Sequence, residues 1–213
     1  MRKYLSPVIL IIAALTYSCA DPAADKPKAT VENAAPESSA AKPAATETLI
    51  ISPENSKVEF VAAKVTRSHQ GSFKQFSGKI DLVPNSIPDS RVSIDIETGS
   101  VVADEADLTG HLKTADFFDV AKLPKATFVS TKIEPSTSGG GTHTVTGNLE
   151  LHGIKKSITF PATIQVTPEN ATVAAEFAIN RKDFGIVYAG KADDLIRDGV
   201  VIKLALKVAR AKR

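Results

Sequence analysis

The sequence predicts an all-β fold: a closed or nearly closed eight-stranded antiparallel β-barrel with one short helix. Three observations lead to this prediction. Apolar and polar residues alternate with a period of two through most of the chain after Leu49, turn-forming residues separate the alternating runs, and one stretch, about 104–118, has helical spacing instead. About eight strands leave sheet edges that must be covered, and closure into a barrel removes them.

Each alternating run has one apolar and one polar face, which is typical of antiparallel strands with one covered face. The phase slips between Phe73 and Phe76, which predicts a β-bulge there. Turn-forming residues at 138–141 and 168–170 predict hairpin loops. The runs that predict strands are residues 58–62, 73–82, 91–97, 144–151, 157–166, 172–179 and 200–208.

The stretch of about 104–118 is predicted to be the helix, because Leu108, Leu112 and Ala115 recur at helical spacing. Acidic residues at 104, 105 and 107 fit the start of a helix, where negative charge is favourable. We interpret them as capping residues rather than as a paired-carboxylate site.

The N-terminal residues 1–18 have the pattern of a lipoprotein signal peptide. Arg2 and Lys3 precede an apolar run that is shorter than the roughly 20 residues of a membrane-spanning helix. Cys19, the only cysteine, follows a small residue directly after this run, which resembles the lipobox of bacterial lipoproteins. Cys19 is therefore the expected lipid-attachment site; the alternative is an ordinary cleaved signal with a chance cysteine. The resemblance implies an exported protein, lipid-anchored to the cell envelope, with Ala20 compatible with an outer-membrane location facing the periplasm.

Residues 19–48 are expected to form a disordered tether, and residues 49–213 a single barrel domain. The tether is rich in Ala and Pro, and Val31 is its only large aliphatic residue, so it buries too little apolar surface to fold alone. Removing Arg2 and Lys3 from the 26 basic residues leaves 24, which equals the 24 acidic residues. This neutral balance gives no electrostatic basis for binding nucleic acid.

The chemistry-bearing residue types do not form a catalytic or metal-binding pattern. The four histidines are scattered without ligand spacing, and the sequence contains no nucleophile elbow and no glycine-rich phosphate loop. We therefore expect a binding protein without a metal or cofactor, and not an enzyme.

Several segments, in order and at fitting intervals, carry a family resemblance. The strongest is residues 111–119 (HLKTADFFD), followed by Pro124, Thr127, Phe128 and Ser130. Residues 56–60 (SKVEF), 180–186 (NRKDFGI) and the glycines at 71, 78, 147 and 153 support it. Together these segments resemble the YceI-like domain family, bacterial periplasmic proteins with a lipocalin-like barrel.

The resemblance implies that the barrel binds, sequesters or carries a long apolar lipid chain of the polyisoprenoid type. Two alternatives remain open: a carrier of another small amphiphile, such as a fatty acid or its amide, and a ligand-free structural module of the envelope. The expected ligand-binding residues are inward-facing or at the barrel mouth: Val58, Phe60, Phe73, Phe76, Ile80, Val92, Ile94, His111, Leu112, Phe117, Phe118, Phe128, Leu149, Phe160 and Phe184.

Individual residues in these segments allow two interpretations. His111 could bond a ligand head group or fix the helix against the barrel rim, and we favour the second. Arg181 and Asp183 are expected to pair or to cap the loop before Phe184, with the tight turn at Gly185. Small residues on the apolar faces leave room inside the barrel unless phenylalanine side chains fill it: Ala62, Gly78, Gly147, Ala162 and Ala175.

Overall fold

The computed structural model describes residues 20–36, 47–137 and 140–211. Twelve strands form one antiparallel sheet, and two short strands form a separate hairpin. The strands are β1 (Thr30–Asn33), β2 (Glu47–Ile51), β3 (Ser56–Ala63), β4 (Ser68–Phe73), β5 (Phe76–Leu82), β6 (Arg91–Glu97), β7 (Val101–Ala103), β8 (Lys125–Pro135), β9 (His143–Leu151), β10 (Ile154–Val166), β11 (Asn170–Asn180), β12 (Gly190–Lys191), β13 (Asp194–Leu195) and β14 (Gly199–Ala209).

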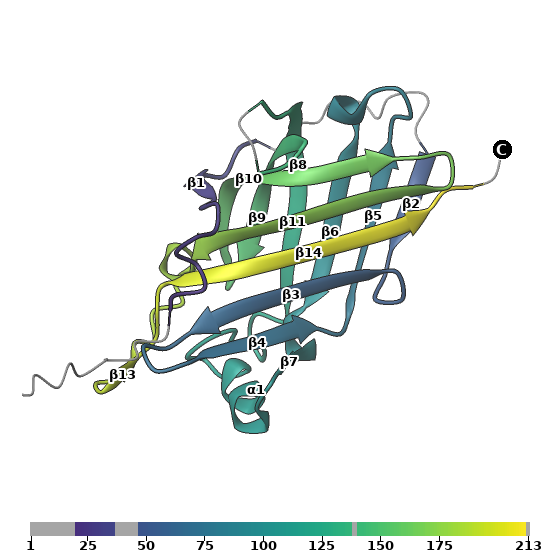
Figure 1. Cartoon of the computed structure of the whole chain (residues 1–213). Helices are drawn as coiled ribbons and strands as arrows, with labels where there is room; N and C mark the ends of the chain where they lie inside the picture. Colours follow the sequence, from purple (N-terminus) through teal and green to yellow (C-terminus); the bar gives the residue numbers. More distant parts are fainter. Residues whose placement is uncertain (1–19, 37–46, 138–139, 212–213) are drawn as a thin grey trace, which may run out of the picture.

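The sheet is strongly curled and confirms the predicted all-β barrel. Its pairing path runs β2-β5-β6-β8-β9-β10-β11-β14-β3-β4-β7. Figure 1 shows β11, β14, β3 and β4 as one wall and β9, β8, β6 and β5 as the other. Two bent strands, β4–β5 and β6–β7, cross between the walls. Counting each bent pair once and setting aside β1, β2 and the separate hairpin leaves eight strands, which agrees with the predicted number.

The bend between β4 and β5 lies where the sequence predicted a bulge, between Phe73 and Phe76. Main-chain hydrogen bonds continue across both bent strands. The Lys74 N–H donates to the Ser100 carbonyl at 3.2 Å, and the Glu97 N–H donates to the Gln75 carbonyl at 3.0 Å. The chain therefore passes from one wall of the barrel to the other while these backbone groups remain hydrogen-bonded.

The helix α1 is shorter than predicted. It spans Ala106–Leu112, and the chain then turns back so that the Phe118 N–H donates to the Leu112 carbonyl at 3.1 Å. This turn brings Phe117 and Phe118 over the barrel interior, which a helix continuing to 118 would not do. The predicted capping is also wrong in part: Glu105 occupies the N-cap without a capping bond, and Asp104 instead accepts from the Gln70 N–H at 3.2 Å.

Phenylalanine rings fill part of the interior beside the small residues. The ring of Phe128 occupies the space that a Cβ on Gly147 would need, and the ring of Phe60 does the same at Gly71. Ala162 and Ala175 are buried in a cluster that contains Phe160 and Phe177. These rings consequently occupy the space beside the small residues, and the same four rings line the free volume that remains in the interior.

Residues 20–36, which we call the N-terminal strap, are ordered along the barrel wall, contrary to the expectation of a disordered tether for this part of 19–48. Strand β1 pairs with β10, and Ala23 is buried against Ala178 and Val201. Figure 1 shows the strap crossing the β10, β11 and β14 side of the barrel. The strap adds to a sheet that is already folded, so it does not need its own core.

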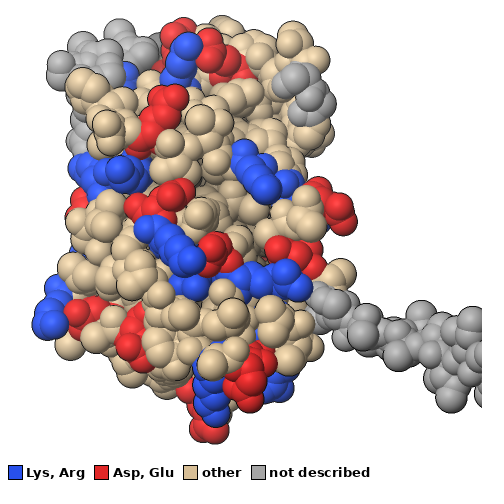
Figure 2. Space-filling view, turned by 90° about the vertical axis from the view of Figure 1, so that its left-hand side faces the viewer, with Lys and Arg blue, Asp and Glu red and all other residues tan. Residues whose placement is uncertain are grey.

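The predicted signal peptide (residues 1–18) and Cys19 lie outside the described residues. Among the residues that are described, no helix is long and apolar enough to cross a membrane. Figure 2 shows acidic and basic side chains interspersed over one face of the molecule, so this face has no patch of a single charge.

Candidate functional site

The barrel encloses a cavity of about 160 Å³. Of its 24 lining residues, all but Glu59 and Arg181 are apolar. The cavity lies in the half of the barrel covered by α1 and by the short 3-10 helix η3 (Arg181–Phe184). Its lining comes from strands on both walls, because alternate residues of each strand point inward.

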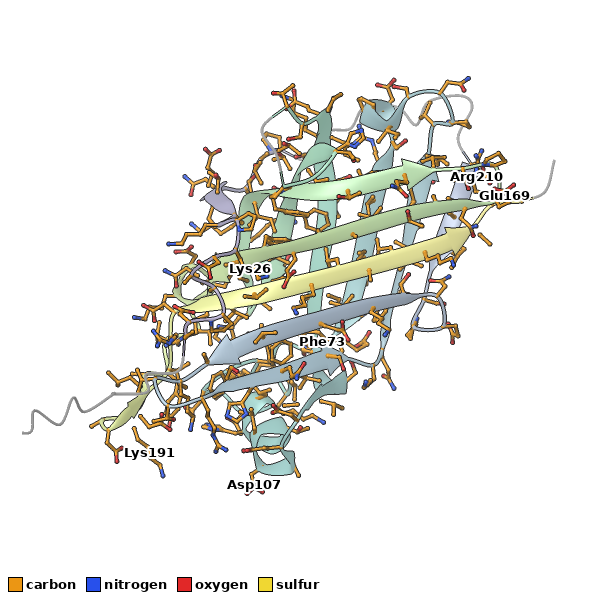
Figure 3. The ribbon with its side chains drawn as sticks, viewed as in Figure 1. Lys26, Phe73, Asp107, Glu169, Lys191 and Arg210 are labelled. Atoms are coloured by element: carbon orange, nitrogen blue, oxygen red, sulfur yellow. The ribbon has the colours of Figure 1, made fainter. Side chains whose placement is uncertain are left out.

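Aromatic rings form the cover of the cavity on the α1 side. Phe73 on β4 contacts Phe60 on β3, with ring centroids 6.0 Å apart, and Phe118, with centroids 5.6 Å apart. Phe73 and Phe118 are only half-buried although they lie against the core, because part of each ring faces open space. Figure 3 labels Phe73 on β4, close to α1.

Ten of the fifteen residues expected to contact a ligand line this cavity: Val58, Phe60, Phe73, Ile94, Leu112, Phe117, Phe118, Phe128, Leu149 and Phe160. The structure places the other five elsewhere. Phe76, Ile80 and Val92 belong to the apolar cluster formed with β2. Phe184 is fully buried in the cluster around Phe177, and His111 lies outside the lining.

Sequence reasoning missed the contribution of the C-terminal strands. The inward faces of β11 and β14 supply five lining residues, Phe177, Ile179, Val200, Ile202 and Leu204. The sequence does indicate these residues, because residues 172–179 and 200–208 show the same period-two alternation as the strands that supply the expected ligand-binding residues. What the pattern lacks is the position of each residue along the barrel axis.

His111 has the local bonding that its structural interpretation requires. Its Nε2 lies 2.8 Å from Asp116 Oδ2, and its ring makes edge-to-face contacts with Phe117 and Tyr188. These contacts hold the turn after α1 against the segment that follows η3. The residue thus helps to position Phe117, which lines the cavity.

Arg181 is the buried cation at the η3 end of the cavity, with 4% of its surface exposed. Its guanidinium donates to main-chain carbonyls of three residues: Arg197 at 3.1 Å, Ile186 at 2.7 Å and Ile196 at 3.3 Å. Burial lowers the pKa of Arg181, and the charge of Asp198 partly offsets this effect. The expected pairing with Asp183 is wrong, since Arg181 pairs with Asp198 at 3.4 Å.

The loop that carries Arg181 is fixed by its own sequence. Asn180 caps η3, its side chain accepting from the Lys182 N–H at 3.0 Å. Gly185 ends η3 with φ of 72°, a left-handed conformation that glycine adopts without strain, as the predicted tight turn requires. Because the guanidinium donors are held by main-chain carbonyls, Arg181 acts as an internal clamp and is not free to bind an anionic head group.

Within the described part of the chain, no group of three or more His, Cys, Asp or Glu side chains is placed to hold a metal ion. The cavity walls offer mostly C–H surface. The arrangement is suited to enclosing an apolar molecule.

Known proteins share this sequence and fold. A UPF0312 protein of Pseudomonas putida (strain W619) is 38% identical over 122 residues, which cover 54% of this chain and 62% of that protein, so the match spans less than two thirds of the relative. The structure of Burkholderia cenocepacia BcnA has a TM-score of 0.65 at 25% identity and covers 74% of this chain and 98% of its own.

A second solved structure is a polyisoprenoid binding domain from Saccharophagus degradans. It has a TM-score of 0.61 at 17% identity and covers 78% of this chain and all of its own, so the likeness concerns the fold. The model of the YceI-like domain matches residues 50–208, which include every strand from β3 to the last inward-facing residue of β14. By this match over most of its length, together with the barrel and its cavity, the chain belongs to the YceI-like domain family.

Proposed function

We propose that the protein binds an extended apolar lipid chain of the isoprenoid type inside its barrel and carries or sequesters it in the bacterial envelope. The observation that supports this most is the cavity, whose lining is apolar except for Glu59 and Arg181. The fold likeness to a polyisoprenoid binding domain supports the same class of ligand. A binding role also fits the family, which is a family of binding proteins.

The driving force is the removal of the chain from water, about 25 cal/mol per Å² of apolar surface. The cavity of about 160 Å³ is close to the size, about 150 Å³, that holds benzene in an apolar protein interior, so it holds roughly one isoprene unit as it stands. A longer chain is accommodated when rings that line the cavity move and enlarge it. Phe73 and Phe118 are the candidates, because they are half-buried and face open space.

The polar end of such a lipid stays outside the barrel. Arg181 is committed to main-chain carbonyls, and Lys64, at the end of β3, is paired with Asp194 at 3.0 Å. Affinity therefore comes from the apolar chain, and ligands with the same chain and different head groups bind with similar strength.

The test is native mass spectrometry and lipid extraction on protein purified from its own envelope. We expect a bound mass that extraction identifies as an isoprenoid. If the extracted ligand is instead a fatty acid or its amide, the protein is a carrier of that amphiphile and not of an isoprenoid. Protein that is always empty, and that takes up neither farnesol nor a fatty acid when these are added, would leave the ligand-free module as the function.

We further propose that Cys19 carries a lipid that anchors the protein to the envelope, at the outer membrane and facing the periplasm. The sequence supports this through the apolar run and the lone cysteine. Directly after Cys19 the strap is already in contact with the barrel: Asp21 pairs with Arg197 at 3.8 Å, and Ala23 is buried. The anchor thus holds the η3 end of the barrel close to the bilayer, rather than at the end of a long tether.

Cys19→Ala is expected to release the protein from the membrane fraction into the soluble fraction, because no acyl chain can then be attached. The measurement is fractionation of cells that express either form, with Ser18→Ala as the control that keeps the thiol. Membrane association that is equal in both variants would contradict the anchor.

A further inference from the structure

The barrel wall has a seam between β10 and β11. The two strands pair only from Thr163–Val166 to Ala171–Ala174. If this register continued, Phe160 would lie opposite Phe177 and Ile158 opposite Ile179, but the earlier part of β10 pairs with β9 on one edge and with β1 on the other. The direct pairing of two barrel strands is therefore interrupted over half of β10.

The N-terminal strap fills this seam with main-chain hydrogen bonds to both sides. Residues 30–33 pair with Lys156–Thr159 of β10. On the other side, the Ala29 N–H donates to the Ala178 carbonyl and the Ala178 N–H donates to the Pro27 carbonyl, both at 2.8 Å. The strap is thus a wedge strand between β10 and β11, and it completes the wall.

Side-chain contacts hold the strap at separate points along its length. Val31 packs half-buried against the cluster around Phe160, and Ala35 exchanges two hydrogen bonds with the buried Asn148 side chain, at 3.0 and 2.8 Å. Lys26 pairs with Glu176 at 3.1 Å, and this bond lowers the pKa of Glu176 against the opposing effect of burial. Figure 3 labels Lys26 where the strap crosses the barrel.

The seam lies directly over the cavity. Ile158 and Phe160 on one side and Phe177 and Ile179 on the other are all lining residues, and the rings of Phe160 and Phe177 stack with centroids 4.1 Å apart. The α1 end of the cavity is covered by Leu112, Phe117 and Phe118. The strap also lies outside residues 50–208, so the family's domain is complete in sequence without the segment that closes its wall.

We propose that the seam between β10 and β11 is the lateral entrance through which an apolar chain reaches the cavity, and that the N-terminal strap is its gate. This inference rests on the proposed function. The strap buries mostly alanine and a single valine, so it opens without unfolding the barrel, as the least stable segments of proteins do. Its opening exposes Phe160 and Phe177 to the incoming chain.

The test is a reversible cross-link of the gate in the full chain carrying Cys19→Ser. Thr30→Cys and Thr159→Cys place thiols at directly paired positions. Paired residues of antiparallel strands have Cα atoms about 4.5–5.5 Å apart, within the range of a disulfide. Uptake of farnesol carrying a fluorophore is followed by stopped flow. We expect the oxidised form to take up the probe at least tenfold more slowly than the reduced form, with the same final occupancy.

The matched control is a cross-link in a continuous part of the wall, Thr172→Cys with Lys207→Cys between β11 and β14. Its oxidation should leave the uptake rate unchanged. Ala23→Glu, which places a charged side chain in a buried strap contact, should raise the rate. Equal rates in the oxidised and reduced Thr30/Thr159 forms would overturn the gate while leaving the binding function intact. Failure of every form to take up the probe would overturn the proposed function, and the gate with it.

Discussion

Replacing Arg181 by methionine is expected to lower the free energy of unfolding by roughly 3 kcal/mol, because buried hydrogen-bond acceptors lose a charged donor. Methionine keeps an unbranched apolar stem and removes the donors. The carbonyls of Ile186, Ile196 and Arg197 lose the guanidinium that now binds them in a buried site. Arg181→Lys should recover only part of the loss, because a point-like ammonium cannot match the fork of the guanidinium.

Lys182→Met is the matched control for the contribution of the ion pair. Lys182 pairs with the same carboxylate, that of Asp198, at 2.9 Å, but its side chain is 47% exposed. An exposed pair of this kind contributes at most about 1 kcal/mol. Urea unfolding of Arg181→Met, Arg181→Lys and Lys182→Met measures the differences in the free energy of unfolding. The comparison requires that its slope against urea concentration is the same in all three variants. If Arg181→Met and Lys182→Met cost the same, the carbonyl clamp is not what stabilises this end of the barrel.

The sequence predicted the wrong partner for Arg181 because it offers distance only along the chain. Asp183 is two residues away, whereas Asp198 is seventeen residues away. The antiparallel register of β11 and β14 pairs Asn180 with Gly199, which brings the residues flanking these two positions together. A contact of this kind depends on register, and alternation alone does not specify which residues of two strands lie opposite each other.

The barrel itself was predictable because each strand buries one face, and a strand with one buried face has apolar residues at every second position. The inward residues of β14 illustrate this, since they alternate from Val200 to Val208 without interruption. Alternation identifies the face of a strand but not the level along the barrel axis. For this reason the sequence predicts Phe76, Ile80 and Phe60 alike as ligand-binding residues. In the structure Phe60 lines the cavity, whereas Phe76 and Ile80 pack in the cluster at the β2 end.

The strap shows a different limit of sequence reasoning. Its composition correctly indicates that it cannot form a core of its own. Composition does not indicate the seam in the barrel wall. There the main-chain groups of β10 that do not pair with β11 can hydrogen-bond to an added strand, and this pairing depends little on the side chains of that strand. The fit is specific at one place: a Cβ on Gly199 would lie 2.8 Å from the Cβ of Ala23, so close packing of the strap requires glycine there.

Filling the cavity is expected to weaken binding of an apolar chain at least tenfold, which corresponds to about 1.4 kcal/mol. Ala62→Phe on β3 and Ala126→Phe on β8 each add a phenyl ring to the lining. A ring of benzene size takes up most of a cavity of about 160 Å³. Two variants on different strands guard against local overpacking, which can itself destabilise a barrel by about 1–3 kcal/mol.

The control for the added ring is Ala205→Phe on β14, an exposed position between inward-facing neighbours. It adds the same surface outside the barrel and should bind as the unmodified protein does. Affinity for farnesol is measured by calorimetry, and unfolding in urea verifies that each variant is folded. Equal affinity in the folded Ala62→Phe and Ala205→Phe variants would show that the chain binds outside the cavity.

A series of straight-chain alcohols tests the same cavity by its capacity. Each added CH₂ that enters the barrel contributes about 0.8 kcal/mol, so affinity should rise about fourfold per carbon until the space is full. A rigid cavity of about 160 Å³ predicts an early plateau, whereas movement of Phe73 and Phe118 predicts that the rise continues to longer chains. Ala62→Phe should shift the plateau to shorter alcohols in either case, because the added ring and the ligand compete for one volume. A plateau at the same chain length in Ala62→Phe and the unmodified protein would contradict binding in this cavity.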